Sequence, residues 1–501
     1  MSIPAFSKPT GQPADVCLIV EGCYPHISGG VSTWLDWLMR ACPTSNFAVR
    51  SIVTPGEARS AKYAFPDNLV DFSEIVLAGP ESRGRRGIGT PAMAAHELAA
   101  LAVAFLESGR LGALARLEQA VNDPNAGISL RDLVSGPYAW RLCLAAYQAL
   151  MPHAPFKDFF WAWHALMGGL FSTMKAELPP ARTYHAISTG YAGLLAARAA
   201  LHGAGQVALT EHGIYTNERR IEILMADWIV DTVDKGLAMA DRRRDLRDLW
   251  ITAFESYARA CYEACDHVTT LFAGNQPMQR LQGARESQLS IIANGIDLDR
   301  FGAVPTCPPG NPPTVSLIGR VVPIKDIKTF VSAAGIIRDR VPNARVIVAG
   351  SMDEDPDYAA ECLALVEELG LSQTVEFAGK VDTATLLATT DVVVLTSLSE
   401  AQPLTILEAG AAGRPCVTTD VGACRDIIEG EAGREGGFIA ELLAADQIAE
   451  HVVRLLLDEQ LRTKLGENLR SRVWRDYASE TSAEKYRALY ASPDGTLQRA
   501  V

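Results

Sequence analysis

The chain has 501 residues, of which 48% are hydrophobic and 21% are charged, and these are the proportions of a globular protein of two or three domains. Its net charge of −13, without a broad basic face, argues against a nucleic-acid-binding protein. The ten cysteines are scattered without a zinc-ligand pattern. Together with a polar N-terminus that lacks a signal peptide, they predict free thiols in a reducing cytosol.

The chain opens with the pattern of a βαβ unit. An apolar run at residues 15–22 predicts a strand, residues 31–40 an amphipathic helix, and residues 47–55 a second strand. Residues 91–175 are rich in Ala and Leu, and we expect a helical insertion there. Within it, segment 156–174 comes nearest to a membrane span, but its charges and glycines favour a buried helix. Later strand-like runs lie at residues 184–188, 206–210 and 267–272.

A proline-rich segment and a second βα series follow. Five prolines within residues 305–313 exclude a helix or central strand and predict an interdomain linker. The fold class we expect is α/β, with two Rossmann-like, doubly wound parallel-sheet domains that face a cleft. The predicted domains are residues 1–304, residues 305–473, and a C-terminal helix at 474–501 that packs back on the first domain. Strands of the second series are expected at residues 314–319, 345–350, 375–379, 392–396 and 415–419.

Two glutamates flank the start of a predicted helix. Glu400 follows the strand that ends near residue 396, and Glu408 lies eight positions later, inside a helical segment at 403–413. In open α/β sheets, ligands bind at the carboxyl ends of the strands, so a long ligand with hydroxyl groups at both ends could contact both acids. A nucleotide-sugar has that form. The alternative is a loop acid and an unrelated acid on the helix surface.

Two cations occupy the same predicted edge. Arg320 and Lys325 follow the strand at 314–319 in the sequence Gly319-Arg-Val-Val-Pro-Ile-Lys325. Arginine binds phosphate oxygens in a bidentate manner and lysine acts as a point charge, so the pair suits a diphosphate leaving group without a metal. Two basic residues on a surface loop are the alternative.

Three residues of the first domain are candidates for ligand contacts. Gly29 and Gly30 precede a helix, where glycine allows close backbone approach and the helix N-terminus favours an anion, or where the pair merely forms a tight turn. His212 follows a predicted strand and could project into the cleft, although a lone histidine is more often structural.

These motifs resemble those of a known family. Gly-Arg-x4-Lys followed by Glu-x7-Glu is similar to the donor site of the retaining glycosyltransferases of family 4, which have the GT-B fold. Residues 21–34 and 188–193, and Thr210-Glu-His-Gly-Ile-Tyr-Thr-Asn-Glu-Arg219, resemble the PelF subfamily, which acts in the cytosol in Pel exopolysaccharide systems. The resemblance spans roughly residues 15–490.

The resemblance implies a role for each donor-site residue. Arg320 and Lys325 would hold the pyrophosphate of a UDP-sugar, Glu400 would contact the sugar, and Glu408 would accept hydrogen bonds from the ribose. Backbone N–H groups at the start of the helix would meet the β-phosphate, and the uracil would lie near residues 379–381. Many relatives have glycine after the first glutamate where this chain has Ala-Gln-Pro, which leaves the choice of sugar open. The remaining candidates of this donor site are Pro403, Leu404, Thr405, Lys380 and Val381.

In the first domain, the resemblance makes His212 a contact of the donor sugar near the reacting carbon, with a role in orientation and charge stabilisation. It makes Gly29 and Gly30 contacts of donor or acceptor, and Glu211, Tyr215 and Glu218 residues that support His212 or bind the acceptor.

The resemblance also implies a reaction and its partners. We expect transfer of a hexose, with retention, from UDP-glucose or a UDP-N-acetylhexosamine to a growing exopolysaccharide of the biofilm matrix. No cofactor or metal is expected to be obligatory, so the Asp-x-Asp patterns at 297–299 and 353–355 are expected not to bind one. The expected partners are the glycan acceptor and inner-membrane synthesis and export proteins, which would recruit a cytoplasmic enzyme to the inner face of the membrane. The alternatives are a UDP-sugar 2-epimerase of the same architecture and a non-catalytic nucleotide-binding scaffold of a secretion complex.

Overall fold

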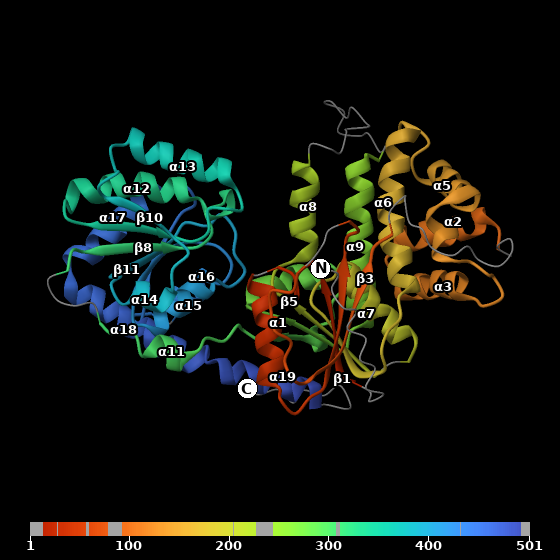
Figure 1. The fold of residues 1–501 in the computed structure, drawn as a ribbon, viewed down its shortest axis with the longest axis horizontal. Helices are drawn as coiled ribbons and strands as arrows, with labels where there is room; N and C mark the ends of the chain where they lie inside the picture. Colours follow the sequence, from red (N-terminus) through yellow and green to blue (C-terminus); the bar gives the residue numbers. More distant parts are fainter. Residues whose placement is uncertain are drawn as a thin grey trace. The chain divides into compact units, whose positions relative to one another are not determined.

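The structure is a computed structural model that describes residues 14–27, 29–56, 60–78, 93–203, 205–226, 244–306, 311–430 and 432–491. It forms two compact units. The first comprises Met1–Thr270, Asn275–Ile291 and Tyr486–Val501, and the second comprises Leu271–Gly274 and Ile292–Lys485. Each unit contains one parallel β-sheet flanked by helices (Figure 1), so the predicted α/β fold class is confirmed. The predicted domain division at residue 305 stays a prediction, and residues 307–310 of the proline-rich segment lie outside the described residues.

The first unit has a seven-stranded sheet in the order β3-β2-β1-β4-β5-β6-β7. The chain reverses its direction of travel across the sheet after β3, because the next strand in sequence, β4, pairs with the other side of β1. Ligands of doubly wound sheets bind at such a reversal. The strands are β1 (Ala14–Glu21), β2 (Phe47–Val53), β3 (Leu69–Val76), β4 (Ala181–Ala186), β5 (Gln206–Glu211), β6 (His267–Thr270) and β7 (Leu289–Ile291).

Helices of the insertion lie between β3 and β4 and form one group in Figure 1. They share a continuous hydrophobic core with α7 and α9, to which Leu117, Leu142 and Phe171 contribute fully buried side chains. Among the described residues, none of the helices is both long enough and apolar enough to cross a membrane, and α6 is buried along its second half. The helices of the first unit are α1 (Gly30–Ala41), α2 (Ala95–Ser108), α3 (Leu111–Asn122), α4 (Leu130–Val134), α5 (Gly136–Leu150), α6 (Phe156–Lys175), α7 (Tyr191–Leu201), α8 (Tyr215–Met225), α9 (Leu246–Ala264) and α10 (Gln276–Leu281).

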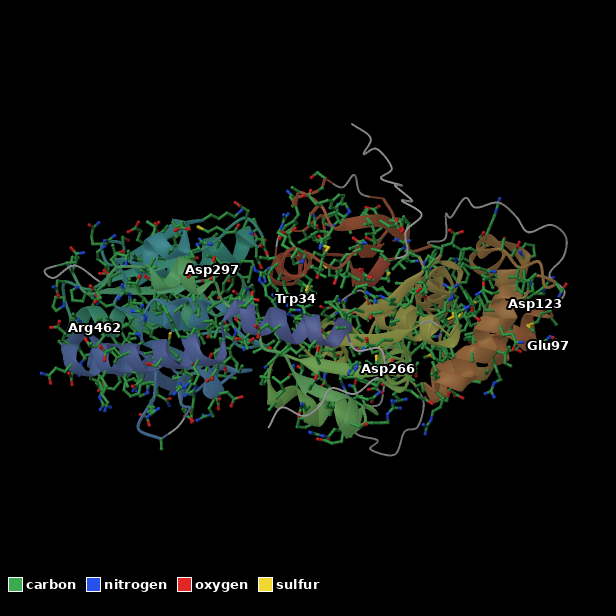
Figure 2. All side chains as sticks on the ribbon, turned by 90° about the horizontal axis from the view of Figure 1, so that it is seen from below. Trp34, Glu97, Asp123, Asp266, Asp297 and Arg462 are labelled. Atoms are coloured by element: carbon green, nitrogen blue, oxygen red, sulfur yellow. The ribbon has the colours of Figure 1, made fainter. Side chains whose placement is uncertain are left out.

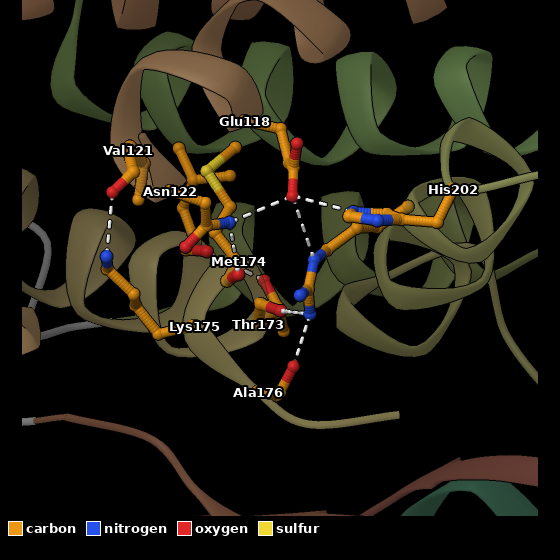
Figure 3. A network of polar contacts seen from close by, with 10 residues as sticks. Glu118, Val121, Asn122, Thr173, Met174, Lys175, Ala176 and His202 are labelled. Atoms are coloured by element: carbon orange, nitrogen blue, oxygen red, sulfur yellow. Dashed lines mark hydrogen bonds and ion pairs between the residues drawn. The ribbon is translucent and has the colours of Figure 1, made fainter. Parts of the chain in front are cut away.

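A polar network fastens the insertion to the rest of the first unit (Figure 3). The Glu118 carboxylate on α3 accepts hydrogen bonds from Asn122 Nδ2 at 2.9 Å and His202 Nε2 at 2.7 Å, and Arg198 Nε on α7 lies 3.4 Å away. Burial acts to raise the pKa of Glu118, but these two hydrogen bonds and the charge of Arg198 outweigh it and hold that pKa below its ordinary value. The ionised form of Glu118 therefore stabilises the packing of α3 on α7.

The second unit has a six-stranded sheet in the order β10-β9-β8-β11-β12-β13. Its central strands are apolar on both faces, as expected for a sheet covered by helices. The strands are β8 (Thr314–Ile318), β9 (Arg345–Ala349), β10 (Val375–Gly379), β11 (Val392–Leu395), β12 (Cys416–Thr419) and β13 (Gly437–Ala440). The helices are α11 (Leu298–Gly302), α12 (Ile327–Arg340), α13 (Pro356–Glu368), α14 (Thr383–Leu387), α15 (Leu404–Ala411), α16 (Cys424–Ile428), α17 (Ala445–Leu457) and α18 (Glu459–Asp476).

The last described helix, α19 (Ser479–Ala491), begins in residues of the second unit and ends in residues of the first. Its final turns are buried in the first unit, where Tyr490 OH lies 2.7 Å from Nδ1 of the buried His185. His185 Nε2 in turn lies 2.8 Å from Thr210 Oγ1 on β5. The C-terminal end of the described chain is thus part of the core of the first unit, which also contains the first strand, β1.

Candidate functional site

Loops at the carboxyl edge of the second sheet are held together by hydrogen bonds to their backbones. Thr396 Oγ1, just after β11, donates to the carbonyl of Lys325 at 2.8 Å, and the N–H of Leu398 donates to the carbonyl of Ile324 at 2.8 Å. On the other side, Gly422 has a φ of +54°, and a Cβ there would lie 2.2 Å from the carbonyl oxygen of Glu400. The loops that carry Lys325 and Glu400 are therefore fixed relative to each other by hydrogen bonds to the main-chain carbonyls of Ile324 and Lys325.

Lys325 and Glu400 form an ion pair between Lys325 Nζ and Glu400 Oε1. Their side chains are only 21% and 14% exposed, and Ser397 Oγ donates to the same carboxylate oxygen at 2.7 Å. A cation and an anion thus lie side by side at the edge where parallel sheets bind ligands. The structure brings together these two predicted site residues from neighbouring strands.

Arg320 and Lys380 are each paired with an acid of the loop between β9 and α13. Arg320 Nη1 lies 2.5 Å from Glu354 Oε2, and Lys380 Nζ lies 3.6 Å from Asp353 Oδ2. Both cations are largely exposed, with side chains 57% and 75% accessible, and neither contacts Lys325 or Glu400 in the described structure. The sequence analysis did not assign these two acids as partners. The sequence feature that could have identified them is the acidic run at 353–355, which follows the predicted strand at 345–350.

Glu408 lies on α15 and is partly buried. Burial raises the pKa of its carboxyl to about 7, which the charge of Arg300 opposes and that of Asp382 reinforces. Within the described part of the chain its carboxylate has no hydrogen-bond or ion-pair partner. An acid of this kind is set to gain from a neutral hydroxyl donor, because hydrogen bonds favour its ionised form.

The start of α15 provides backbone N–H groups close to Glu400. Its N-cap, Pro403, makes no side-chain capping hydrogen bond, and the first helical residue is Leu404. Thr405 Oγ1 instead donates to the carbonyl of Ile318 at 3.3 Å, which ties the helix to the end of β8. Gln402, which the sequence analysis did not single out, accepts the N–H of Asn294 at 2.6 Å and holds the loop before the helix. Val381 is 42% exposed beside Lys380, after β10.

The first unit contains a cavity of about 250 Å³ at the carboxyl edge of its sheet. The cavity is lined by Glu21, Cys23, Val31, Ile187, Ser188, His212, Gly213, Tyr215, Glu218 and Arg219. These residues lie at or just after the ends of β1, β4 and β5 or begin α1 and α8, so three stretches that are distant in sequence, residues 21–31, 187–188 and 212–219, converge there.

His212 is the candidate catalytic residue of this cavity. Its ring packs edge-on against that of Trp34 on α1, which is labelled in Figure 2, with ring centroids 4.7 Å apart. Burial lowers the pKa of His212 to about 4, so the imidazole is neutral at physiological pH. Its Nε2 is buried and finds no hydrogen-bond partner among the described residues. The ring lines the cavity as a neutral group, so it can contact a ligand there without adding charge to the site.

Two acids support this cavity, Glu21 in its lining and Glu211 outside the lining. Glu21, at the end of β1, accepts hydrogen bonds from Ser188 Oγ at 2.7 Å, Ala192 N at 2.8 Å and Tyr215 OH at 3.0 Å. It thereby fixes the N-terminus of α7 and the start of α8. Burial raises the pKa of Glu211 to about 7, against hydrogen bonds from Tyr262 and Gln279. Glu21 was missed as a functional residue by the sequence analysis, although it opens the first motif of the resemblance.

Gly29 and Gly30 leave open space at the N-terminus of α1. A Cβ added at either glycine would meet no atom within 4 Å, and α1 has no side-chain cap. The φ of Gly29 is 175°, an extended conformation that any residue adopts, so backbone geometry does not require glycine there. The next residue, Val31, lines the His212 cavity. The structure places these glycines beside that cavity, with room for a ligand near the helix N-terminus.

The two Asp-x-Asp patterns have structural partners. Asp297 caps α11 by accepting the N–H of Arg300 at 3.0 Å, and Asp355 caps α13 by accepting that of Tyr358 at 3.0 Å. The described residues contain no group of three or more His, Cys, Asp or Glu that could hold a metal ion.

Comparison with solved structures defines the class of fold. The chain is similar to Anabaena HepE in complex with UDP and glucose, with a TM-score of 0.58 and 14% identity over 96% of this chain and 100% of that one. It is also similar to sucrose-phosphate synthase from Thermosynechococcus elongatus, with a TM-score of 0.55 and 18% identity over 95% and 98% of the two chains. These likenesses show the GT-B fold.

The family is shown by the first half of the chain. The chain belongs to the family described as "Domain of unknown function (DUF3492)", which matches residues 14–287. A second family, "Glycosyl transferases group 1", matches residues 306–472, which include every donor-site candidate of the second unit.

Curated relatives match less than half of this chain. It is 32% identical to N-acetyl-α-D-glucosaminyl L-malate synthase of Bacillus anthracis over 168 residues, which are 33% of this chain and 42% of that protein. It is 27% identical to N,N′-diacetylbacillosaminyl-diphospho-undecaprenol α-1,3-N-acetylgalactosaminyltransferase of Campylobacter jejuni over 228 residues, which are 43% of this chain and 57% of that protein. The chain thus spans about half the length of these relatives.

Proposed function

We propose that this protein is a retaining glycosyltransferase that transfers a hexose from UDP-glucose or a UDP-N-acetylhexosamine to a growing glycan, without an obligatory metal. The match of residues 306–472 to group 1 glycosyltransferases and the glycosyltransferase names of the relatives support the reaction class. UDP in the HepE complexes supports the choice of nucleotide. The observation that carries the proposal is the pairing of Lys325 with Glu400 at the carboxyl edge of the second sheet.

The ion pair suits a ligand that presents phosphate and hydroxyl groups together. When the diphosphate arrives, Lys325 exchanges the Glu400 carboxylate for a phosphate oxygen, and the freed carboxylate accepts hydrogen bonds from the sugar. Arg320 makes the same exchange from Glu354, while Glu408 accepts the ribose hydroxyls. The uncapped start of α15 adds backbone N–H groups for the β-phosphate.

Transfer then follows at the anomeric carbon of the sugar. The bond from that carbon to the UDP oxygen breaks, and Lys325 and Arg320 stabilise the charge that develops on the diphosphate. The acceptor hydroxyl forms the new bond from the same face and gives its proton to a phosphate oxygen of the departing UDP. His212 orients the sugar as a neutral ring, and Gly29 and Gly30 allow a ligand to approach the start of α1 closely.

We further propose that the product is a Pel-like exopolysaccharide of the biofilm matrix and that the enzyme works in the cytoplasm with inner-membrane synthesis and export proteins. The motifs at residues 21–34 and 210–219 support this assignment by their resemblance to the PelF subfamily. Both motifs contribute residues to the His212 cavity.

The test is calorimetric titration of the full chain with UDP, ADP and GDP in the absence of divalent cations. We expect selective binding of UDP that Lys325→Ala weakens strongly. Lys328→Ala is the matched control, because Lys328 is an exposed lysine three positions later that pairs with Glu361. Preference for ADP or GDP would contradict the UDP assignment, and equal losses in the two variants would contradict the role of Lys325. A screen of UDP-sugars for transfer then separates a transferase from a 2-epimerase, which needs no acceptor.

A further inference from the structure

The ring of His212 is not held by a hydrogen bond in the described part of the chain. Its Nε2 is buried without a partner, and neither ring nitrogen has a hydrogen-bond partner among the described residues. The outer torsion angle of a histidine side chain is broad and roughly two-fold, so it leaves the plane of the ring poorly defined. A histidine that orients a ligand therefore needs another contact to fix its plane.

Trp34 supplies such a contact. It lies one turn into α1, and its indole meets the imidazole of His212 nearly at a right angle, with an interplanar angle of 81° and ring centroids 4.7 Å apart. Edge-to-face pairs are favourable at centroid distances of about 4.5–7 Å, and they favour one angle between the two rings. Trp34 is itself only 6% exposed, and close packing holds a buried side chain in one rotamer.

Two further rings contact the indole of Trp34, and both are buried in the first unit. The ring centroid of Tyr486 on α19 lies 5.4 Å from that of Trp34, and the ring centroid of His185 on β4 lies 6.3 Å away. His185 has partners on both ring nitrogens, Tyr490 OH at 2.7 Å and Thr210 Oγ1 at 2.8 Å. The indole therefore packs against rings that have fixed positions of their own.

The C-terminal helix is also tied to the helix that carries Trp34. Arg487 Nε on α19 donates to the carbonyl of Ala41, the last residue of α1, at 3.1 Å, and the two helices lie side by side in Figure 1. Tyr486 and the residues after it belong to the first unit, as His212 does. Within that unit, α19 thus contacts Trp34, and Trp34 contacts His212.

We propose that Trp34 is a positioning residue for His212 and that the ring of Tyr486 supports Trp34 in this role. The inference rests on the proposed function, in which His212 contacts the donor sugar near the reacting carbon. The described lining of the His212 cavity does not include Trp34, so this tryptophan acts through His212. Positioning matters for rate, because a displacement of about 1 Å can cost about 100-fold in catalysis.

The first experiment measures the release of UDP from UDP-glucose or a UDP-N-acetylhexosamine by variants of the full chain. We expect Trp34→Leu to lower kcat by about 10- to 100-fold and to leave the Kd of UDP unchanged. Trp37→Leu is the matched control, because Trp37 is a partly exposed tryptophan on the same helix, and it should keep kcat. Circular dichroism checks that each variant is folded.

Tyr486 provides a second pair of variants, which carries the same tests if Trp34→Leu does not fold. Tyr486→Leu removes the ring that contacts Trp34 and should lower kcat, although less than Trp34→Leu does. Tyr486→Phe keeps the ring and should retain kcat, because the hydroxyl of Tyr486 lies 3.4 Å from Thr210 Oγ1, at the limit of a hydrogen bond. Equal losses in the two variants would contradict the supporting role of the ring.

A double variant separates positioning from general packing. If Trp34 acts through His212, adding Trp34→Leu to His212→Ala costs no further rate, because the group that it positions is already absent. A tryptophan with a merely structural role would lower kcat by the same factor in both backgrounds, and that result would overturn the proposal. Full activity of His212→Ala alone would instead contradict the proposed role of His212 in transfer, and the positioning role would fall with it.

NMR of the histidine side chains tests the contact without any transfer. The ring current of an indole displaces the resonances of a ring that packs against it, and the His212 signal is identified by its loss in His212→Ala. Trp34→Leu should move this signal and Trp37→Leu should not. An unmoved His212 signal in Trp34→Leu would overturn the proposal, even if the unaltered chain released no UDP and the proposed function had failed separately.

Discussion

Replacing Glu400 by glutamine is expected to tighten the binding of UDP while abolishing sugar transfer. In the free protein Lys325 is paired with Glu400, so the diphosphate must displace this carboxylate before it reaches the ammonium group. The side chains are 21% and 14% exposed, which places the pair between surface ion pairs, worth about 0.2–1 kcal/mol, and buried charged hydrogen bonds, worth about 1.5–3 kcal/mol. An intermediate value of about 1–2 kcal/mol converts to UDP binding that is about 5- to 30-fold tighter in Glu400→Gln.

Calorimetry with UDP measures this change, and chemical unfolding checks its origin. Without ligand, Glu400→Gln should lower the free energy of unfolding by the same value of about 1–2 kcal/mol, because Lys325 stays partly buried without its partner. Saturating UDP should reduce this difference in unfolding free energy between the unaltered protein and the variant. Glu361→Gln is the control, since it breaks the exposed pair with Lys328 and should leave UDP affinity unchanged. Weaker or unaltered UDP binding in Glu400→Gln would refute the idea that the carboxylate competes with phosphate for Lys325.

Three further predictions concern groups that titrate. The pKa of Glu408 is raised to about 7, and hydrogen bonds from ribose hydroxyls favour its ionised form. UDP binding near pH 7 should therefore release more protons from the unaltered protein than from Glu408→Gln, as measured by calorimetry in two buffers. Equal proton release would contradict the ribose contact. His212→Ala should reduce transfer severely yet keep UDP binding, and because its pKa is about 4 the loss should be the same at pH 6 and pH 8; a loss confined to one pH would show that the ring works through its charge. Because the pKa of Glu118 is lowered in the folded protein, its contribution to stability is complete above its ordinary pKa and is lost as pH falls through the lower, folded-state value. Glu118→Gln should therefore lower the free energy of unfolding in urea by about 1–2 kcal/mol at pH 7 and by less at pH 3. An equal loss at both pH values would refute the proposed role of the Glu118 charge.

The strands that the sequence predicted and those it missed differ in their place in the sheet. All interior strands of both sheets were predicted, because helices cover both of their faces and they appear as continuous apolar runs. The three missed strands are β3, β7 and β13, and each lies at an edge. The residues of β3 are half-exposed and include Asp71 and Glu74, and β7 has only three residues. An edge strand needs little apolar sequence because one side of it has no neighbour.

A similar limit applies to the candidate site. The order of strands and motifs predicted that Lys325 and Glu400 follow strands at one edge, and β8 and β11 are indeed neighbours. The direct pairing of the two side chains could not be predicted, because it depends on the hydrogen bonds that Thr396 Oγ1 and the Leu398 N–H donate to carbonyls of the loop before α12. The C-terminal segment 474–501 was expected as one helix, but α18 ends at Asp476 and α19 starts at Ser479, and residues 492–501 lie outside the described residues.

The three cations proposed to bind the donor, Arg320, Lys325 and Lys380, all have carboxylate partners in the described structure. We expect the contribution of each cation to UDP affinity to follow how deeply its ion pair is buried. The pair of Lys325 is the least exposed, that of Arg320 is about half-exposed, and that of Lys380 is mostly in solvent. Solvent and salt screen exposed charges strongly, so a phosphate gains most from the cation with the least exposed surroundings. Removing that cation also leaves its acid to repel the phosphate. UDP affinity should therefore fall most in Lys325→Ala, less in Arg320→Ala and least in Lys380→Ala. On the proposed donor assignment, the site exchanges carboxylate partners for phosphate oxygens, so a protein with net charge −13 binds an anionic donor without building up uncompensated positive charge.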